Sequence, residues 1–155
     1  MSVLQIVQIA ALAIWVAGIL FLNLVFGPAV FLMISNRDEA EAAYSNGLVW
    51  LHRLGYAAAA IYLVAGVRQN GLVATVLDPL NIVLCVAMVL ALVSDFRYLP
   101  RKSAIREELG SVSSTPIGDP RRVEFDRLGK MTTSTEITIF ALGILLLITA
   151  LWIPR

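Results

Sequence analysis

The chain has 155 residues, the length of one domain. Hydrophobic residues make up 59% of it and charged residues only 15%, and the apolar residues form runs of about 20 residues or more, long enough to cross a bilayer. The net charge of +1 gives no reason to expect nucleic acid as a partner, and the single cysteine, Cys85, excludes an internal disulfide and a cysteine-built metal site. We therefore expect an all-α integral membrane protein whose main partner is the lipid bilayer.

The first predicted span, residues 3–34, is longer than one crossing needs. Its start has no basic segment and its apolar run is too long for a signal-peptide core, so we interpret it as a retained span. Pro28 follows Gly27 inside the run and removes one helical hydrogen bond, which predicts a bend after about Phe26 and a short interfacial extension. We expect Asn23 to hydrogen-bond a neighbouring helix, with ligand binding as the alternative.

A polar segment, residues 36–47, comes next and is rich in helix-forming residues. Ala40 and Tyr44 give it a weak apolar face at helical spacing, so we expect it to lie along the membrane surface. Asn46 and Gly47 form a turn signal, which predicts a break between this segment and the following span.

The second predicted span, residues 48–67, carries a helix-packing face of mostly small residues spaced three or four apart. This face consists of Gly55, Ala59, Tyr62 and Gly66. His52 and Arg53 lie in the first full turn of the span. The simplest interpretation is that Arg53 reaches the headgroups while His52 makes a structural hydrogen bond.

A short connection at residues 68–71 predicts that spans two and three are antiparallel neighbours. The third span, residues 79–96, is expected to begin at Pro79 with Asp78 as its N-cap, because proline suits the first turn of a helix. Residues 72–77 are then an interfacial leader, or alternatively the first part of a kinked third span.

Residues 97–130 form the one long hydrophilic region, and we predict a loop there between the third and fourth helices of a four-helix bundle. Within it, residues 100–109 are expected to extend the third helix, and turn-forming residues predict a flexible loop at 110–120. Opposite charges three or four apart predict that a helix restarts at 121–128, before a fourth span at 131–153.

The distribution of Lys and Arg predicts the orientation. Ten of the 12 basic residues fall in or beside the segments that join spans one to two and three to four. Basic loops stay in the cytoplasm, so we expect residues 97–130 inside and both termini outside. The compact size favours a bacterial inner membrane, that is, a plasma membrane, as the location.

Four motifs then suggest a family. They are AIWVAGILF at 13–21, GPAVF at 27–31, YLPR at 98–101 and DPRRVEFDRL at 119–128. Together they resemble a family of four-helix membrane proteins of unknown function, which includes bacterial proteins related to the eukaryotic transmembrane protein 205. The resemblance spans most of the chain and implies a four-helix membrane protein without an established enzyme activity.

The chain departs from that family at the start of its last helix. The family often has a histidine after the Phe-x-x-Leu element, followed by serine and asparagine farther along. This chain has Gly129 after Leu128, and then Thr132 and Glu136. A function that depends on the family's histidine or asparagine is therefore not implied for this chain.

The candidate site is a polar layer in the cytoplasmic half of the bundle, made of Asn23, His52, Arg53, Asp95, Thr132 and Glu136. Glu136 lies about 8 Å below the start of its span at a rise of 1.5 Å per residue, and a carboxylate at that depth needs a partner. The same arithmetic places His52 and Arg53 at the same depth. We predict that Arg53 pairs with Glu136 and that His52 donates a hydrogen bond; a protonated Glu136, or one that reaches headgroup water, is the alternative.

The sequence contains no nucleophile–base pair, phosphate loop or dinucleotide fingerprint, so we expect no enzyme, cofactor or metal site. Our first hypothesis is an accessory subunit that packs against other membrane proteins, for example in a respiratory or photosynthetic assembly, or against copies of itself. The second is a small transporter or channel-like protein that uses the polar layer. A third is a haem or metal protein that uses Met33, His52 and Met131 near one boundary.

Overall fold

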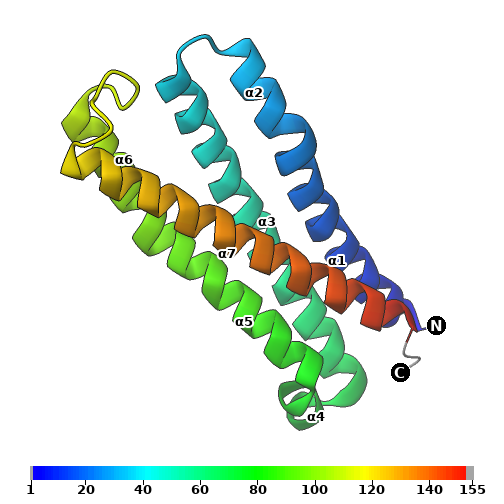
Figure 1. Cartoon of the computed structure of the whole chain (residues 1–155). Helices are drawn as coiled ribbons and strands as arrows, with labels where there is room; N and C mark the ends of the chain where they lie inside the picture. The colour runs from blue at the N-terminus through cyan, green and yellow to red at the C-terminus, as the bar shows by residue number, and fades with distance from the viewer. Residues whose placement is uncertain (1, 153–155) are drawn as a thin grey trace.

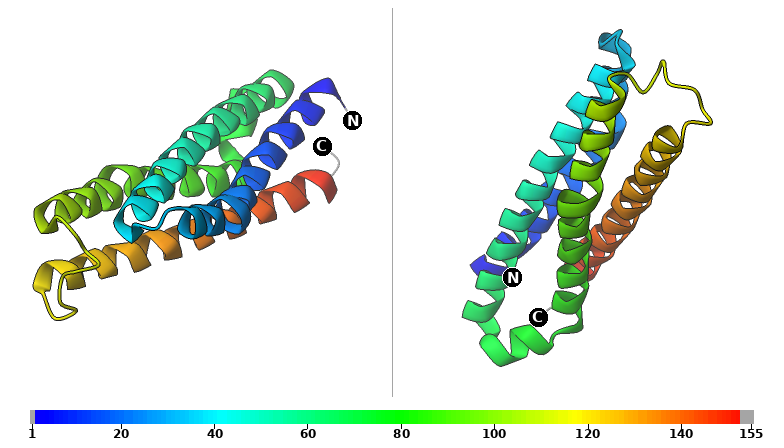
Figure 2. Two further views of the ribbon diagram at one scale, coloured as in Figure 1. Left: turned by 90° about the horizontal axis from the view of Figure 1, so that it is seen from above. Right: turned by 90° about the vertical axis from the view of Figure 1, so that its left-hand side faces the viewer.

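The computed structural model describes residues 2–152 and is built from helices, without a β-strand in this range. Four helical rods lie side by side in alternating directions (Figures 1 and 2). They cover Val3–Met33, Arg37–Asn70, Pro79–Leu109 and Pro120–Trp152, and each is long and apolar enough to cross a membrane. The predicted all-α bundle of four long helices is confirmed.

The first rod consists of α1 (Val3–Phe21), the π-helical turn η1 (Leu22–Phe26) and α2 (Gly27–Met33). It continues as a helix through Pro28, and a π-helical turn that ends at Phe26 lies where a bend was predicted. In η1 the backbone N–H of Gly27 bonds to the carbonyl of Leu22, five residues back. A wide turn of this kind accommodates a proline that has no N–H and whose ring crowds the carbonyl four residues earlier.

The second rod is the single helix α3 (Arg37–Asn70), which begins where the side chain of Asn36 accepts a hydrogen bond from the N–H of Asp38 at 3.0 Å. The predicted separate surface segment at 36–47 and its turn at Gly47 are therefore wrong. Gly47 lies inside the helix because the first rod packs there: a Cβ at this position would be 2.8 Å from Cε1 of Phe26. The glycine serves close helix packing and not a turn.

The connection to the third rod consists of Gly71, the short helix α4 (Leu72–Leu77) and Asp78. Gly71 has a φ of +82°, a conformation that side chains disfavour, and this ends α3. The side chain of Asp78 caps α5 (Pro79–Val93), as predicted, by accepting from the N–H of Leu80 at 3.0 Å. Residues 72–77 are thus separate from the third rod. The predicted bounds of the connection, 68–71, are wrong, because residues 68–70 belong to α3 and the connection runs from Gly71 to Asp78.

The third rod continues from α5 through a second π-helical turn, η2 (Ser94–Tyr98), into α6 (Leu99–Leu109). This confirms that the third helix extends into the hydrophilic region. Only residues 110–119 of that region lie outside helices, because α7 (Pro120–Trp152) already begins at Pro120. Val112 anchors this loop by packing with Ile105 and Phe125 in a small second core. Residue 153, the predicted end of the fourth span, lies outside the described residues.

The main core is centred on Trp15 of α1, which is 1% exposed. The predicted packing face of α3 lies against it and the neighbouring turns: a Cβ on Gly55 would be 2.5 Å from Nε1 of Trp15, and one on Gly66 would be 3.2 Å from Gln8. All four residues of that face are buried, as predicted. Gly143 of α7 also contacts Trp15, so this indole separates α3 from α7 at close range.

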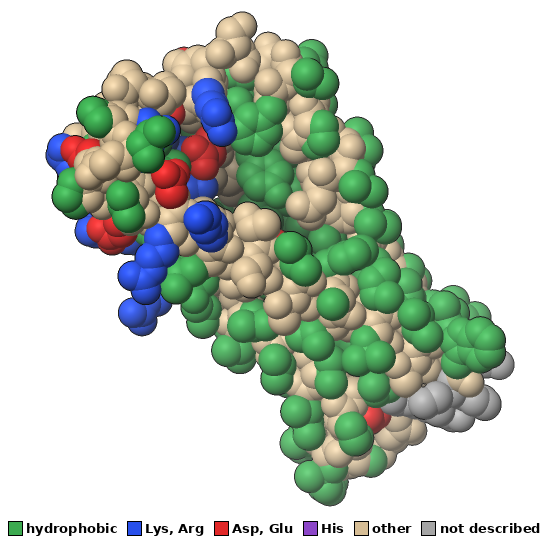
Figure 3. Space-filling model, viewed as in Figure 1, with side chains coloured by type: hydrophobic (Ala, Val, Ile, Leu, Met, Phe, Trp, Pro, Cys, Tyr) green, Lys and Arg blue, Asp and Glu red, His purple; other side chains and the backbone are tan. Residues whose placement is uncertain are grey.

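The outer surface divides into two parts (Figure 3). Large apolar side chains are exposed along the outer faces of all four rods. Charged side chains gather at the end of the bundle formed by α6, the 110–119 loop and the start of α7. Such a distribution is compatible with a multi-pass membrane protein.

Replacing Gly55 with alanine should destabilise the bundle by about 1–3 kcal/mol, because the added methyl group overlaps the indole of Trp15. Gly129→Ala is the matched control, since it also lies inside a helix but its nearest neighbour would be 3.7 Å away. Thermal unfolding in detergent should therefore shift down for Gly55→Ala and stay level or rise for Gly129→Ala. Equal melting temperatures for the two variants would contradict the close contact between α1 and α3.

Candidate functional site

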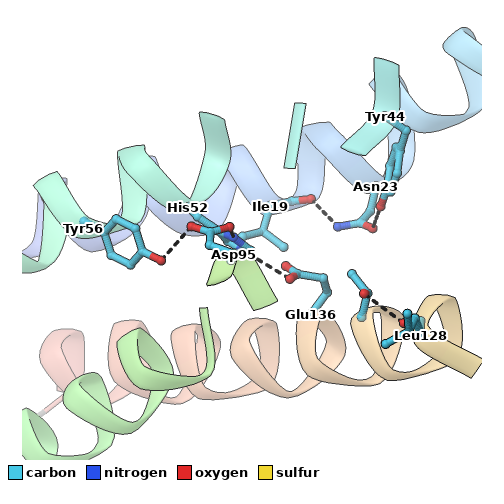
Figure 4. Close-up of polar contacts among 9 residues, drawn as sticks. Ile19, Asn23, Tyr44, His52, Tyr56, Asp95, Leu128 and Glu136 are labelled. Carbon is cyan, nitrogen blue, oxygen red and sulfur yellow. Dashed lines mark hydrogen bonds and ion pairs between the residues drawn. The ribbon is translucent and has the colours of Figure 1, made fainter. Parts of the chain in front are cut away.

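The polar centre of the bundle is an imidazole held between two carboxylates from different rods (Figure 4). Nδ1 of His52 on α3 is 2.5 Å from Oδ1 of Asp95, and Nε2 is 2.9 Å from Oε1 of Glu136 on α7. The side chains are 2%, 13% and 6% exposed in the order His52, Asp95 and Glu136. His52 thus connects the second, third and fourth rods through one continuous line of polar contacts.

Asp95 reaches His52 from a locally widened backbone. It is the second residue of η2, and Pro100 follows this turn at the same distance at which Pro28 follows η1. Both π-helical turns carry a polar side chain that bonds to α3, Asp95 of η2 to His52 and Asn23 of η1 to Tyr44. Wide turns of this type occur often at functional sites, because they change the direction of side chains within a helix.

Tyr56 fixes the second oxygen of Asp95. Its hydroxyl donates to Oδ2 of Asp95 at 2.9 Å, and it lies four residues after His52, on the same side of α3. Both oxygens of Asp95 therefore have partners, and its carboxyl plane is held relative to the imidazole.

The contacts of His52 leave the cluster with one uncompensated negative charge. Each of the two contacts of the imidazole ring needs one hydrogen, which is bonded either to the ring nitrogen or to the carboxyl oxygen. If both are on the ring, a positive imidazolium faces two negative carboxylates; if one belongs to a carboxyl group, a neutral imidazole faces one carboxylate and one acid. The net charge is negative in both arrangements, and a buried net charge is costly without a further cation or proton.

Glu136 is the residue of the cluster that has a carboxyl oxygen without a hydrogen-bond partner among the described residues. This oxygen, Oε2, is buried. Glu136 also lines a cavity of about 240 Å³ between α1, α3 and α7, whose other walls are mostly apolar. The polar residues around this cavity are Asn23, Tyr44, Thr132, Thr133 and Glu136. A carboxylate beside an apolar cavity can bind a cation or hold a proton.

The mouth of this cavity lies between the first and fourth rods. Leu24 and Ile137 line it and are 69% and 64% exposed. Both belong to the apolar outer surface of the bundle. An occupant would therefore reach Glu136 from the side of the bundle and not along its axis.

Two further residues of the predicted polar layer border the cavity without joining the cluster. Asn23 donates to the carbonyl of Ile19 at 2.9 Å and accepts from the hydroxyl of Tyr44 at 3.0 Å, which ties the first rod to the second. Thr132 donates to the carbonyl of Leu128 in its own helix at 3.0 Å. These contacts are structural, and Glu136 is the carboxylate among the residues that line the cavity.

The predicted pair of Arg53 and Glu136 is wrong. The guanidinium of Arg53 is exposed and lies 4.9 Å from the centre of the Trp50 ring, while His52 is the partner of Glu136. Adjacent residues of a helix point about 100° apart, so His52 and Arg53 cannot both face the interior. Sequence reasoning also missed Tyr44 and Tyr56, although the four-residue spacing from His52 to Tyr56 was a usable signal.

The geometry does not favour the haem or metal hypothesis. Both ring nitrogens of His52 already face carboxylate oxygens, so neither is free to bind iron. Met33 is 83% exposed on the outer surface. Within residues 2–152, no group of three or more His, Cys, Asp or Glu side chains is arranged to hold a metal ion.

Comparison with known proteins adds no further assignment. No protein family, curated protein or solved structure matches this chain. The resemblance to the transmembrane protein 205-like family stays a prediction that rests on the four sequence motifs. The site is therefore interpreted from its own contacts.

The stabilities of His52 and Glu136 variants should be strongly coupled. Removing one partner of a buried ionic contact costs about 3–5 kcal/mol, so His52→Gln and Glu136→Gln should each destabilise the protein. The double variant should lose less than the sum of the two, by about 0.5–3 kcal/mol. Denaturant titration of the four proteins in detergent measures this coupling.

Arg53→Leu is the control for that cycle, because it removes the neighbouring charge on α3. Its effect should add to that of Glu136→Gln. Coupling between Arg53 and Glu136, together with additivity between His52 and Glu136, would overturn the arrangement of the cluster.

Proposed function

We propose that this chain is a multi-pass protein of a bacterial plasma membrane that binds and transports a small organic cation at Glu136. The observation that carries the proposal is the buried, unpartnered Oε2 of Glu136 in the wall of an otherwise apolar cavity. A buried carboxylate oxygen without a donor is unfavourable by about 1–3 kcal/mol or more, and a cationic N–H donor removes that cost.

The charge of the cluster supports a cation over an anion or a neutral ligand. The contacts of His52 leave one negative charge in the bundle, and the residues lining the cavity include no Lys or Arg that would balance it. A protonated amine that binds beside Glu136 gives this buried carboxylate a positive partner. The apolar walls favour a cation with a hydrocarbon part over a bare, strongly hydrated metal ion.

The size and mouth of the cavity define the occupant further. Pockets for drug-sized ligands have volumes of roughly 300–1,000 Å³. The cavity of about 240 Å³ is smaller, which suits a primary alkylammonium ion of a few carbon atoms. Because the mouth lies on the apolar outer surface, such an amphipathic ion would enter from the bilayer with its charged end toward Glu136.

The accessory-subunit hypothesis stays a prediction. It rested on the absence of catalytic groups together with small-residue faces, and the main face of this kind, on α3, packs within the bundle. Gly55 contacts Trp15, and Gly66 contacts Gln8 and Thr75. The transport proposal is preferred because Oε2 of Glu136 lies unpartnered among the described residues beside a cavity, which an assembly role does not require.

The orientation in the membrane can be tested by cysteine labelling. In a Cys85→Ala background, Ile117→Cys in the loop should react with a membrane-impermeant maleimide only after cells are opened, since basic segments stay inside. Asn70→Cys, at the opposite end of the bundle, should react in intact cells. The reverse labelling pattern would contradict the proposed orientation. Recovery of the protein outside the membrane fraction, with both cysteines labelled, would contradict membrane insertion.

Uptake of radiolabelled butylammonium into proteoliposomes tests the transport proposal. Glu136→Gln should reduce both binding and uptake by about tenfold or more, because loss of a buried charge partner costs at least about 2 kcal/mol. Glu107→Gln is the matched control, since Glu107 is exposed on α6, and it should behave like the unmodified protein. Absence of binding, or binding that is equal in the two variants, would refute the proposed cation site.

A further inference from the structure

A second cavity lies on the other side of His52. It has a volume of about 210 Å³ and is formed by the second and third rods, at the charged end of the bundle. Its polar lining residues are Ser45, Asn46, Asp95, Lys102, Ser103 and Arg106. Val49, Leu99 and Pro100 complete its lining, so this cavity is mixed in character but offers more polar groups than the cavity at Glu136.

His52 separates the two cavities. Glu136 belongs to the first cavity and Asp95 to the second, and the imidazole contacts both through opposite ring nitrogens. His52 itself is 2% exposed and lines neither cavity. The only polar connection between Glu136 and Asp95 among the described residues is the imidazole ring.

We infer that His52 conducts a proton between Glu136 and the second cavity, so that cation binding at Glu136 is exchanged for the release of one proton at Asp95. This inference rests on the proposed cation site and adds the ion against which the cation is exchanged. An imidazole suits the task because it accepts a proton at one nitrogen while it releases another from the opposite nitrogen.

The transfer balances in protons and charge. Before binding, Glu136 is an acid that donates from Oε1 to Nε2, and Nδ1–H donates to the Asp95 carboxylate. When an alkylammonium ion binds at Oε2, the O–H bond of Glu136 breaks as an Nε2–H bond forms, and the Nδ1–H bond breaks as the proton moves to Oδ1 of Asp95. Asp95 then releases that proton to water in the second cavity. Cation release reverses these steps and restores the first ring tautomer.

Other ionisable groups around the path have defined positions. Tyr56 donates to Oδ2 of Asp95 at 2.9 Å and acts as a positioning residue that holds the carboxylate after the proton has left. Lys102 and Arg106 of α6 line the second cavity, and Lys102 also pairs with Glu41 of α3. Tyr44 faces the first cavity from α3 and donates to Asn23. None of these groups lies between His52 and either carboxylate.

The rate of proton release in a weakly buffered detergent solution tests the inference. Stopped-flow mixing of the protein with butylammonium, followed by a pH-indicator dye, should show about one proton released per cation bound. Asp95→Asn keeps the shape of the side chain but cannot carry the proton, so release should slow by about tenfold or more, since acid–base groups contribute such factors. Equilibrium dialysis gives the affinity of this variant for butylammonium, so that the release rates of the two proteins are compared at saturating cation.

A second variant keeps the test independent of the stability of Asp95→Asn. Ser103→Cys in a Cys85→Ala background places a thiol in the wall of the second cavity, and its reaction with a bulky maleimide should slow proton release in the same way. The Cys85→Ala protein treated with the same reagent is the control and should release protons at the unmodified rate.

The outcomes separate the two proposals. Failure of the unmodified protein to bind butylammonium would refute the cation site itself. Cation binding with unchanged release rates in Asp95→Asn and in the blocked Ser103→Cys protein would show that the proton leaves directly from Glu136 through the first cavity. That result would overturn the role of His52 while leaving the cation site intact.

Discussion

The contact of one buried imidazole with two carboxylates is the interaction on which the centre of this bundle depends. His52 is nearly inaccessible, and its partners come from the third and fourth rods. In an apolar surrounding these groups have no alternative partners, so each helix is fixed in rotation and depth by the need to keep the contact. Hydrophobic packing alone specifies such a bundle less strictly, since small sliding movements between apolar faces cost little when the outer faces are apolar as well.

Close packing around Trp15 supplies the second constraint. Gly55 and Gly143 allow α3 and α7 to approach the indole from two sides, and their lack of side chains determines how near the rods lie. The polar cluster joins α3, η2 and α7, and the contacts of Trp15 join α1, α3 and α7. Position along the helix axis is therefore set by the charged groups, and separation between helices by the glycines.

Much of the fold could be predicted because hydrophobic runs, the Asp78 cap and the small-residue face are local signals. The tie between Glu136 and the second span could also be predicted, because a constant rise per residue places Glu136 and His52 at the same level. The choice between His52 and Arg53 could not, because it depends on the rotation of α3 about its axis. The turn expected at Asn46 and Gly47 failed for a related reason: Gly47 is required by the nearby ring of Phe26, a contact that no local pattern reveals. The two π-helical turns were not predicted either, because the sequence shows only the prolines that follow them, Pro28 and Pro100.

The unbroken length of α3 has a mechanical consequence. This helix reaches from Asp38, which accepts hydrogen bonds from the hydroxyls of Ser111 and Ser113, to His52 and on to Asn70 without a wide turn. We expect a continuously hydrogen-bonded helix of this length to move as a rigid body. The first and third rods, by contrast, are each interrupted by one π-helical turn, η1 and η2, where the regular α-helical hydrogen-bond pattern is broken. We expect a displacement at the charged end to move His52 through α3, while the first and third rods adjust at the π-helical turns that carry Asn23 and Asp95.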